Sequence, residues 1–580
     1  MTEAIDQQLP LDIPLSHAPR ERHATLGRIG PHSSLAMAQS RLAILGAVST
    51  IAFLVVALRL IDATMFQANS TIANYGEPGG APMVARADIT DRNGQMLATS
   101  LPAQSLYADP AKLLDPVTAA RGIANALPGI KFEEVLDKLT SAKRFVWIKR
   151  NLTPDEVYKV NALGQPGLEF QEESTRLYPA GTSTVHVLGY TDVDGKGLSG
   201  LERALNGPLA AGGAPITSSI DLRVQHIMER ELSKAIQSFS AVGGAGMVMD
   251  MYTGEMLAAV SLPDFAPGQL ATSTDEERFN RFSLGTYELG SVMKVITTAA
   301  GLESGHMTLD TFYDAANPIK YGRFTINDYH PEHRALSVAE VFIYSSNIGA
   351  ARMAMDMGPA FQREFMCKIG LCEPVKTELM ELGTPQIPAN WSDISSMTIS
   401  FGHGISITPL HMMQATAATL TGNLVTPTFL KRDDVTTPQG VTVISPRTVD
   451  QMHRVFRANV VAGSGKSADV PGYFVGGKTG TAEKTQGRRY NRDARLSSFI
   501  GAFPMNKPRY LIYAMIDEPR PNATSHGYAT GGWVAAPVVG NVIAQLGPLY
   551  GIPPADPNDP DIRKATQLEI RSRQEEIETY

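Results

Sequence analysis

A serine and a lysine three residues apart open a segment whose apolar residues recur at helical spacing. In YELGSVMKVITTAAGLESG these residues are Ser291 and Lys294, followed by Val295, Ile296 and Ala299. On a buried helix starting at Ser291, residues three apart share a face, so the amine lies one turn from the hydroxyl. A desolvated lysine can be unprotonated and can take the serine proton. The segment therefore predicts a nucleophile with its own base, although S-x-x-K alone occurs about once by chance in a chain this long.

A second motif, Ser345-Ser346-Asn347, offers groups that move protons and hold amides. It follows a stretch in which Ser337 and Glu340 have the spacing of a capping box that opens a short helix. We expect Ser345 to relay a proton to or from an amine, and the Asn347 amide to hold the lysine and a substrate amide. The alternative is an ordinary turn between helices.

The third motif, Lys478-Thr479-Gly480-Thr481, lies on a strand-like run entered through two glycines. Glycine lets a substrate backbone lie against a strand edge, the threonine hydroxyls can bind a terminal carboxylate, and Lys478 adds positive charge. K-T-G is expected only about a tenth of a time by chance. We therefore predict that the three motifs, far apart in the chain, converge on one cleft.

Other residue types give no metal or thiol chemistry. His403, between two glycines in FGHGIS, has no partner ligand and is interpreted as part of a tight turn near the cleft. The two cysteines, Cys367 and Cys372, are too few for a disulfide framework or a zinc site. Inert thiols at a helix end are the favoured interpretation, and a local disulfide stays open in an oxidising compartment.

Composition places the chain among globular proteins of more than one domain. It has 580 residues, 43% hydrophobic and 19% charged, with a formal net charge of -7. Nucleic-acid binders usually carry a basic excess on one face. Nucleic acid is therefore excluded as an expected partner.

An apolar run near the N-terminus predicts a membrane anchor. LAILGAVSTIAFLVVAL extends to Ile61, and the stretch 42–61 is long enough to cross a hydrocarbon core of about 30 Å. Arginines precede the run, at positions 20, 22, 28 and 41. The positive-inside rule then puts the N-terminus in the cytoplasm and the remaining chain outside it. A cleaved signal peptide and a buried core helix are the alternatives.

Residues 86–215 read as a mixed unit without catalytic residue types. Asn93-Gly94 lies between two strand-like runs and predicts a hairpin, because both residues tolerate positive φ. Helical patches follow, at FEEVLDKLTSAK and after Thr153-Pro154. A scaffold is the better interpretation of this unit.

From about Ile216 the order is strands, then helices, then strands again. A hairpin turning at Tyr252–Gly254 is followed by a helix-rich middle, and strands return at YFVGGKTGTA, LSSFIGAFP and RYLIYAMID. This order predicts one domain whose sheet is assembled from both ends. The basic segment KTQGRRYNRDARLS is expected to be a mobile loop beside the site, with a solvated hairpin tip as the alternative, and the residues after Tyr550 a mobile tail.

The order SVMK, SSN, KTGT resembles penicillin-binding proteins and serine β-lactamases. The likeness covers about residues 86 to 545 and includes RADITDRNG, MDMYTGEMLAAVSLP and GGKTGTAEK, which are similar to class B signatures. The wording YELGS and FGHGIS is most similar to the division-specific D,D-transpeptidases of that class. The elongation-specific branch is the nearest competitor.

The resemblance implies a multi-domain α+β and α/β fold with a single N-terminal transmembrane helix. It implies a mixed pedestal domain of the dimerisation type and a β-lactamase-like transpeptidase domain, whose central antiparallel sheet is flanked by helices. The expected parts are 1–41 cytoplasmic tail, 42–61 anchor, 62–85 linker, 86–215 pedestal, 216–550 transpeptidase domain and 551–580 tail.

The resemblance also implies the reaction. Ser291 would attack the D-Ala-D-Ala carbonyl of a peptidoglycan stem peptide, release D-alanine and form an acyl-enzyme that a neighbouring amine resolves into a septal crosslink. Lys294, Ser345, Asn347 and Lys478 would be the other catalytic groups. Thr479, Gly480 and Thr481 would bind substrate, with the backbone amides of Ser291 and Thr481 as the oxyanion hole. β-Lactams would acylate the same serine. The resemblance implies that no metal and no organic cofactor is required.

The implied location is the inner membrane, with the catalytic domain in the periplasm. A membrane-embedded glycan polymerase and other divisome proteins are the implied partners. A β-lactamase would lack the anchor and the pedestal, and a class A enzyme would need a further catalytic domain. An inactive division scaffold of the same fold is the alternative from another functional class, and the intact motif residues argue against it.

Overall fold

The computed structural model describes residues 49–51, 53–57, 85–433, 439–486, 489–571 and 577–579. Residues 1–83 and 84–580 form two compact units. Most of the predicted anchor lies outside the described residues; the described parts of it, 49–51 and 53–57, are helical and their side chains are exposed. Within the described chain, one segment is apolar and long enough to cross a membrane, Gly531–Leu549, but 56% of its most apolar window is buried inside the fold.

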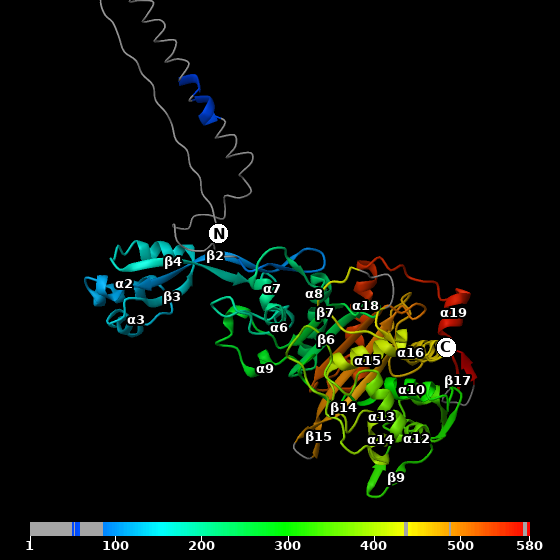
Figure 1. Cartoon of the computed structure of the whole chain (residues 1–580). Coiled ribbons are helices and arrows are strands. Elements are labelled where there is room, and N and C mark those ends of the chain that lie inside the picture. Colours follow the sequence, from blue (N-terminus) through cyan, green and yellow to red (C-terminus); the bar gives the residue numbers. More distant parts are fainter. Residues whose placement is uncertain are drawn as a thin grey trace, which may run out of the picture. The chain divides into compact units, whose positions relative to one another are not determined.

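The first part of the second unit is built on a five-stranded sheet, in the order β3-β2-β1-β5 with β4 also paired to β2. Strands β2, β3 and β4 are labelled in Figure 1. Its strands are β1 Ile89–Thr90, β2 Met96–Ala108, β3 Val146–Leu152, β4 Leu168–Leu177 and β5 Ile216–Thr217. Its helices are α2 Pro116–Ala126, α3 Phe132–Leu139, α4 Pro154–Asn161, α5 Val185–Leu188, α6 Gly200–Ala204 and α7 Asn206–Ala210.

Local sequence explains two elements of this part. The predicted hairpin at Asn93-Gly94 joins β1 to β2, and Gly94 takes the positive φ of +84° that the turn requires. Helix α4 begins as predicted after Thr153, whose side chain accepts from the Glu156 backbone N–H while the Glu156 carboxylate accepts from the Thr153 N–H.

The rest of the chain surrounds a second five-stranded sheet, in the order β14-β15-β16-β6-β7, and every neighbouring pair is antiparallel. Its strands are β6 Gly243–Asp250, β7 Met256–Leu262, β14 Gly476–Gln486, β15 Arg489–Phe503 and β16 Tyr510–Asp517. Two strands precede the helix-rich middle and three follow it. The prediction of a central antiparallel sheet assembled from both ends is therefore confirmed.

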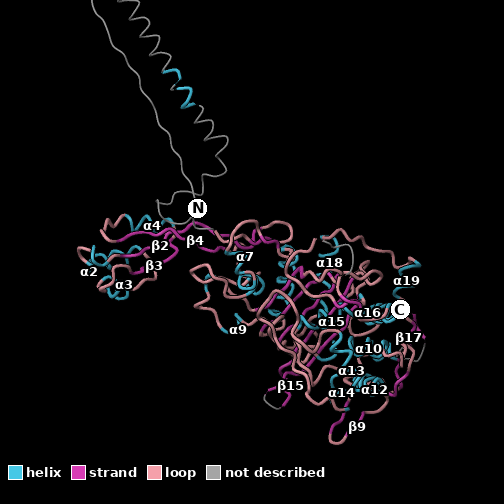
Figure 2. The backbone as a smooth tube through the Cα atoms, viewed as in Figure 1, coloured by secondary structure: helices cyan, strands magenta, loops and turns pink. Residues whose placement is uncertain are grey.

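Helices cover both faces of this sheet, as Figures 1 and 2 show. On one face α8 Leu222–Ser238 and α18 Ala536–Leu549 pack in one apolar core. On the other face α10 Lys294–Glu303, α15 Pro409–Thr421 and α16 Pro446–Val461 share a larger core with α11 Val338–Ile343, α12 Asn347–Met357 and α13 Pro359–Lys368. The nucleophile candidate therefore lies on a helix buried between the sheet and other helices.

Shorter elements connect these layers. They are α9 Asp275–Arg278, α14 Asp393–Ile399, α17 Gly531–Val534, α19 Pro560–Thr566, β8 Phe312–Asp314, β9 Ile319–Tyr321, β10 Phe324–Ile326, β11 Ala335–Ser337, β12 Asn423–Leu424, β13 Val441–Thr442, β17 Glu569–Arg571 and β18 Ile577–Thr579.

The cysteines correct one expectation, because Cys367 and Cys372 form a disulfide rather than two inert thiols. Helix α13 ends at Lys368 and the chain reverses at Gly370, which has a φ of +88°. The reversal leaves the two Cα atoms 4.8 Å apart, within the usual range for a disulfide of about 4.4–6.8 Å. The helix end that suggested inert thiols is the feature that brings them together.

The C-terminal residues correct a second expectation, since their described part is not a mobile tail. Helix α19 is capped by the Asp559 side chain and starts with Pro560. Ile562 and Ile570 are only 7% and 4% exposed and belong to the large core. Proline and aspartate content suggested a loop, but two well-spaced isoleucines are enough to dock this segment.

The basic segment after the third motif is a third correction. Strands β14 and β15 continue through it, pairing as far as Gln486 with Arg489. The segment is therefore a long hairpin, which was the alternative, rather than the favoured mobile loop, and its two tip residues lie outside the described chain. A register shift between Glu483 and Lys484 marks an irregularity in the pairing near the site.

Candidate active site

The segment that carries Ser291 is held by close backbone contacts. A 3₁₀ turn, Gly290–Met293, precedes α10, so the helical stretch starts one residue earlier than predicted and its first turn is tighter. Gly290 has a φ of +60°, and a Cβ there would lie 2.4 Å from the carbonyl oxygen of Thr481. Only glycine fits. This contact places the backbone next to Ser291 directly against strand β14.

The amine of Lys294 is at the centre of the first two motifs. Its Nζ lies 2.9 Å from the Ser291 hydroxyl oxygen and donates to Asn347 Oδ1 at 2.7 Å and to the carbonyl oxygen of Ser345 at 2.8 Å. The side chain is 1% exposed. The predicted same-face arrangement of Ser291 and Lys294 is therefore present in the structure.

Lys478 of the third motif reaches the same place from the sheet. Its Nζ donates to Ser345 Oγ at 3.0 Å, and Lys294 Nζ lies 3.2 Å from the same oxygen. Lys478 is fully buried. All three motifs therefore meet at one cluster of polar atoms, with the Ser345 hydroxyl between two amines.

Burial changes the acid-base properties of both lysines. It lowers the pKa of Lys294 to about 7, against a smaller raising effect of the Asp328 carboxylate. Burial also lowers the pKa of Lys478, and the nearby charge of Lys294 lowers it further. Two ammonium groups next to one buried hydroxyl are unfavourable in free energy, because their charges repel each other away from water. An unprotonated Lys294, able to accept the Ser291 proton, is therefore accessible near neutral pH.

Asp328 was missed by sequence reasoning, although it organises the second motif. Its carboxylate accepts from Ser346 Oγ at 2.7 Å and from the backbone N–H of Ile348 at 2.9 Å, at the start of α12. Asn347 Nδ2 also donates to the carbonyl oxygen of the preceding residue, Asn327, at 3.1 Å. No local pattern links Asp328 to a helix that begins many residues later, so only the folded structure reveals it.

The backbone of the second motif is strained at one residue. Ser345 has a φ of +60°, in the left-handed region that costs a residue with a side chain about 1–2 kcal/mol. The residue stands between α11, which starts with the predicted Ser337–Glu340 capping box, and α12. In this conformation the Ser345 hydroxyl contacts both lysines, and the Ser345 carbonyl oxygen contacts Lys294.

The third motif is fixed by neighbours that its sequence does not show. Ser464 and Thr479 share a hydrogen bond between their hydroxyls of 2.6 Å, and the Gly531 N–H donates to Thr481 Oγ1 at 3.1 Å. Asn459 Nδ2 donates to the Gly477 carbonyl at 2.7 Å. Ser464 is exposed, so this edge of the strand has a solvent-facing hydroxyl that sequence reasoning missed.

Gly480 also has a local packing role that the sequence did not predict. A Cβ there would lie 2.7 Å from the Leu289 carbonyl oxygen and 2.5 Å from Ser498 Oγ. The missing side chain therefore makes room for the nucleophile segment as well as for anything lying along the strand.

The predicted turn at His403 is confirmed beside the cluster. Gly402 and Gly404 have φ values of +87° and +76°, and the Gly290 N–H donates to the Gly402 carbonyl at 3.3 Å. Burial lowers the pKa of His403. Among the described residues no group of three or more histidine, cysteine or acidic side chains is arranged to hold a metal ion.

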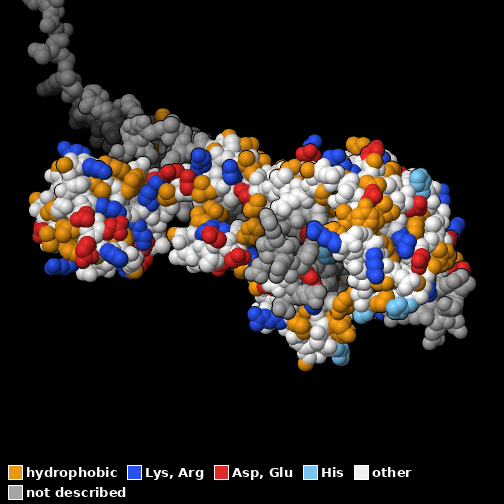
Figure 3. Space-filling view, turned by 90° about the horizontal axis from the view of Figure 1, so that it is seen from below, with side chains coloured by type: hydrophobic (Ala, Val, Ile, Leu, Met, Phe, Trp, Pro, Cys, Tyr) orange, Lys and Arg blue, Asp and Glu red, His pale blue; other side chains and the backbone are white. Residues whose placement is uncertain are grey.

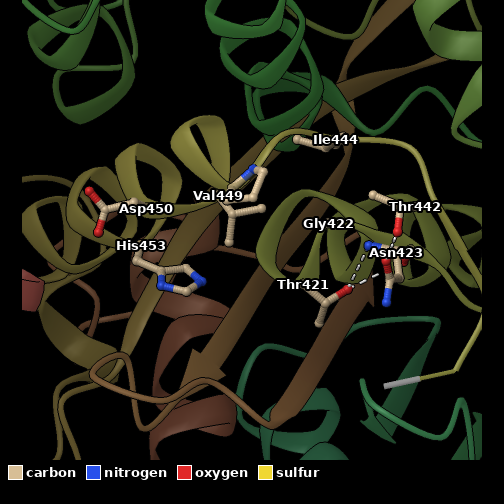
Figure 4. Close-up of a pocket in the computed structure, with 9 residues that line it drawn as sticks. Thr421, Gly422, Asn423, Thr442, Ile444, Val449, Asp450 and His453 are labelled. Carbon is tan, nitrogen blue, oxygen red and sulfur yellow. Dashed lines mark hydrogen bonds between the residues drawn. The ribbon is translucent and has the colours of Figure 1, made fainter. Parts of the chain in front are cut away.

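A separate hollow of about 360 Å³ lies at the C-terminal end of α15 (Figure 4). It is lined by Thr421, Gly422, Asn423, Thr442, Ile444, Pro446, Val449, Asp450 and His453. His453 Nε2 shares a 2.7 Å hydrogen bond with the Leu420 carbonyl, and burial lowers its pKa. None of the motif residues lines this hollow, so it is not the cleft predicted from the sequence.

Two segments of the chain match known protein families. Residues 244–544 match the penicillin binding protein transpeptidase domain, and residues 83–209 match the penicillin-binding protein dimerisation domain. The transpeptidase match spans all three motifs.

Similar proteins extend this likeness over most of the chain. The probable peptidoglycan D,D-transpeptidase FtsI of Caulobacter vibrioides is 42% identical, over 81% of this chain and 82% of the relative. The peptidoglycan D,D-transpeptidase FtsI of Escherichia coli K12 is 28% identical, over 79% and 82%. The crystal structure of penicillin binding protein 3 from Mycobacterium tuberculosis with ampicillin has a TM-score of 0.66 at 24% identity, covering 82% of this chain and 98% of that one. The last comparison shows a shared fold.

Proposed function

We propose that this chain, which belongs to the class B penicillin-binding proteins and is a serine-type peptidoglycan D,D-transpeptidase, crosslinks the septal wall through an ester on Ser291. Peptidoglycan is the substrate, and β-lactams are ligands of the family. The similarity to two FtsI proteins supports the septal role.

In the proposed first half-reaction, neutral Lys294 takes the proton of the Ser291 hydroxyl as its oxygen attacks the penultimate D-alanine carbonyl. The backbone amides of Ser291 and Thr481 stabilise the oxyanion. Ser345, in contact with both lysines, passes a proton to the leaving amine, and the C–N bond breaks. D-Alanine leaves and the donor peptide stays as an ester on Ser291.

In the second half-reaction an amine of a neighbouring stem peptide attacks the ester. The amine loses a proton through Ser345 and Lys294, and the Ser291 oxygen regains one, so the enzyme returns to its starting state. Lys478, Thr479 and Thr481 bind the terminal carboxylate of the donor in the first step. Asn347 holds Lys294 and the substrate amide.

The observation that carries this mechanism is the meeting of three distant segments at Ser345. Lys294 comes from α10, Lys478 from β14 and Ser345 from the turn between α11 and α12, yet both amines lie within hydrogen-bond distance of one hydroxyl. Burying two lysines together costs free energy, and an ordinary turn or capping motif does not require it. The buried pair is therefore more typical of a functional site.

We also infer the inner-membrane location from the apolar run 42–61 and from the Cys367–Cys372 disulfide, since disulfides form mainly in oxidising compartments. The proposed layout keeps 1–41 in the cytoplasm, with 62–85 as linker, 86–215 as pedestal and 216–550 as catalytic domain in the periplasm. A membrane-embedded glycan polymerase and other divisome proteins are the proposed partners.

Labelling with a fluorescent penicillin tests the catalytic assignment. The wild-type chain and Ser238→Ala, a change of an exposed serine at the end of α8, are expected to label covalently, and Ser291→Ala is expected to remain unlabelled. An unlabelled wild type would instead favour an inactive scaffold.

Depletion in the native cell tests the septal role. Filaments are expected because septal crosslinking fails while elongation continues. Round cells would assign the protein to elongation instead.

A further inference from the structure

A row of three aromatic rings lies on the outer face of the pedestal sheet. Tyr107 stacks on Phe145 with ring centroids 4.6 Å apart, and Phe145 meets Trp147 edge-on at 4.9 Å. Phe145 is 44% exposed. Their strand neighbours Leu106 and Ile148 point the other way, into the core beneath α2 to α4. The three rings contact one another, and parts of their faces and edges stay exposed on this side of the sheet.

Charged side chains surround the rings, and each contacts a carboxylate. Lys112 pairs with Glu169 at 2.7 Å and Arg144 with Asp109 at 2.9 Å. A third cation, Arg150, lies against one of the rings, with its guanidinium carbon 4.9 Å from the Trp147 ring centroid. Figure 3 shows basic, acidic and hydrophobic side chains interspersed over the visible face of this end of the molecule.

Arg150 is neutralised in turn, because it pairs with Glu173 at 2.6 Å and with Asp194 at 2.7 Å. The surroundings of the ring row are therefore polar but carry little net charge.

A hollow lies at the end of the sheet where β2 ends and β3 begins, close in the chain to the ring residues, none of which lines it. It has a volume of about 360 Å³ and is lined by residues 139–143 and by Pro110, Ala111 and Pro116. The Arg144–Asp109 pair connects the two in the chain, since Lys143 and Pro110, which line the hollow, are its direct neighbours and Phe145 follows Arg144. The volume of the hollow falls in the range of small-molecule sites, about 300–1,000 Å³. Thr140 and Ser141 give it hydroxyls.

We propose that the hollow and the ring row together bind the glycan strand of peptidoglycan, an inference that rests on the proposed function because that strand carries the stem peptides. A sugar ring offers an apolar C–H face to an aromatic ring and hydroxyls to polar neighbours, which is the combination found here. One sugar residue occupies the hollow, and the next residues lie over Phe145 and Trp147.

The balance of charges selects this ligand over the other polymers. Nucleic acid and anionic membranes are bound through cations that neutralise phosphates, whereas Lys112, Arg144 and Arg150 already face carboxylates and leave Lys143 as a single cation without one in the described part of this surface. A protein partner would have to remove water from the exposed pairs, with Arg144 73% exposed, at a cost in free energy. A hydrated sugar strand leaves these pairs in water.

Binding of peptide-free glycan strands, immobilised at one end, to the detergent-solubilised full chain tests the proposal. Phe145→Ala with Trp147→Ala is expected to weaken binding at least tenfold. Tyr158→Ala, which removes an aromatic ring 74% exposed on α4 of the same pedestal, is the matched control and is expected to bind as the wild type does. All three proteins are expected to label equally with penicillin, which shows that the catalytic domain is folded.

The outcomes separate this inference from the catalytic assignment. Ser291→Ala should keep glycan binding while losing the penicillin label. Equal binding by the double variant and the wild type would overturn the proposal. So would no binding of bare glycan by the wild type, or a tenfold loss in Tyr158→Ala. Trp147→Phe, which keeps a ring, should retain most of the affinity.

Discussion

Lys294 and Lys478 share the hydroxyl of Ser345, with their Nζ atoms 3.2 and 3.0 Å from its oxygen. Both amines are buried, and burial lowers both pKa values. The state in which both lysines are protonated is therefore disfavoured at neutral pH. One amine can be a base while the other keeps its charge, and the contact of Lys294 with Ser291 supports the proposed base role of Lys294.

The first prediction concerns the pH dependence of acylation. Because the pKa of Lys294 is lowered to about 7 and the neutral amine is the active form, the acylation rate should rise with pH through about 7 and then level off. Lys294→Met should lower the rate by a factor of about 10²–10⁴, as is usual for loss of a general base.

The second-order rate of labelling by a fluorescent penicillin, measured from pH 5.5 to 9, checks this. Lys376→Met changes an exposed lysine and should leave the profile unaltered. A rate that does not vary with pH in the wild type would contradict the assignment of the base.

The second prediction concerns Asp328. Its negative charge raises the pKa of Lys294 against the effect of burial. Asp328→Asn keeps the shape of the side chain and removes the charge, so the pKa of Lys294 should fall and the rising limb of the acylation profile should move to lower pH. Asp310→Asn, at an exposed position, is the control. A limb that stays in place or moves to higher pH would show that Asp328 acts on α12 alone.

The contrast between Ser291 and Asp328 shows how much of the site could be predicted. Ser291 and Lys294 are neighbours on one helix, so their spacing alone predicts their contact. Asp328 contacts α12 across a loop, and no periodicity encodes that approach. Ser464 was missed for the same reason, since its hydrogen bond to Thr479 depends on how α16 and β14 pack.

The same distinction holds for the fold. The turn at Asn93-Gly94, the helix start at Thr153-Pro154 and the capping box of Ser337 with Glu340 are local, and all three were predicted. The docking of Ile562 depends on a core surface made by distant segments, so composition gave the wrong answer there. The length of the β14–β15 hairpin also escaped prediction, because its polar residues resemble a loop until they pair across the strands.

The third prediction separates strain from chemistry at Ser345. Its φ of +60° suits glycine, whereas a side chain there costs about 1–2 kcal/mol. Ser345→Gly should therefore unfold at the same temperature as the wild type or slightly higher, and Ser345→Ala at the same or lower. Both should lose acylation to a similar extent, because both lack the hydroxyl that contacts the two lysines.

Thermal unfolding and penicillin labelling of the two variants side by side provide the measurement. Retained labelling in Ser345→Gly would mean that the hydroxyl is dispensable and that the turn itself is what the site needs.

The fourth prediction concerns the Cys367–Cys372 disulfide, which closes a short loop behind α13. By the chain-entropy relation, a loop with a separation of 5 residues stabilises the fold by about 2 kcal/mol.

Replacing both cysteines by serine should lower the free energy of unfolding by about that amount, read from the urea midpoint at constant slope. Penicillin labelling should persist at 25 °C, because the bridge joins two residues outside the three motifs. Adding a reductant to the wild type should reproduce the midpoint of the double variant and leave that of the variant itself unchanged. Equal midpoints for oxidised wild type and double variant would show that the reversal at Gly370 holds the loop without the bridge.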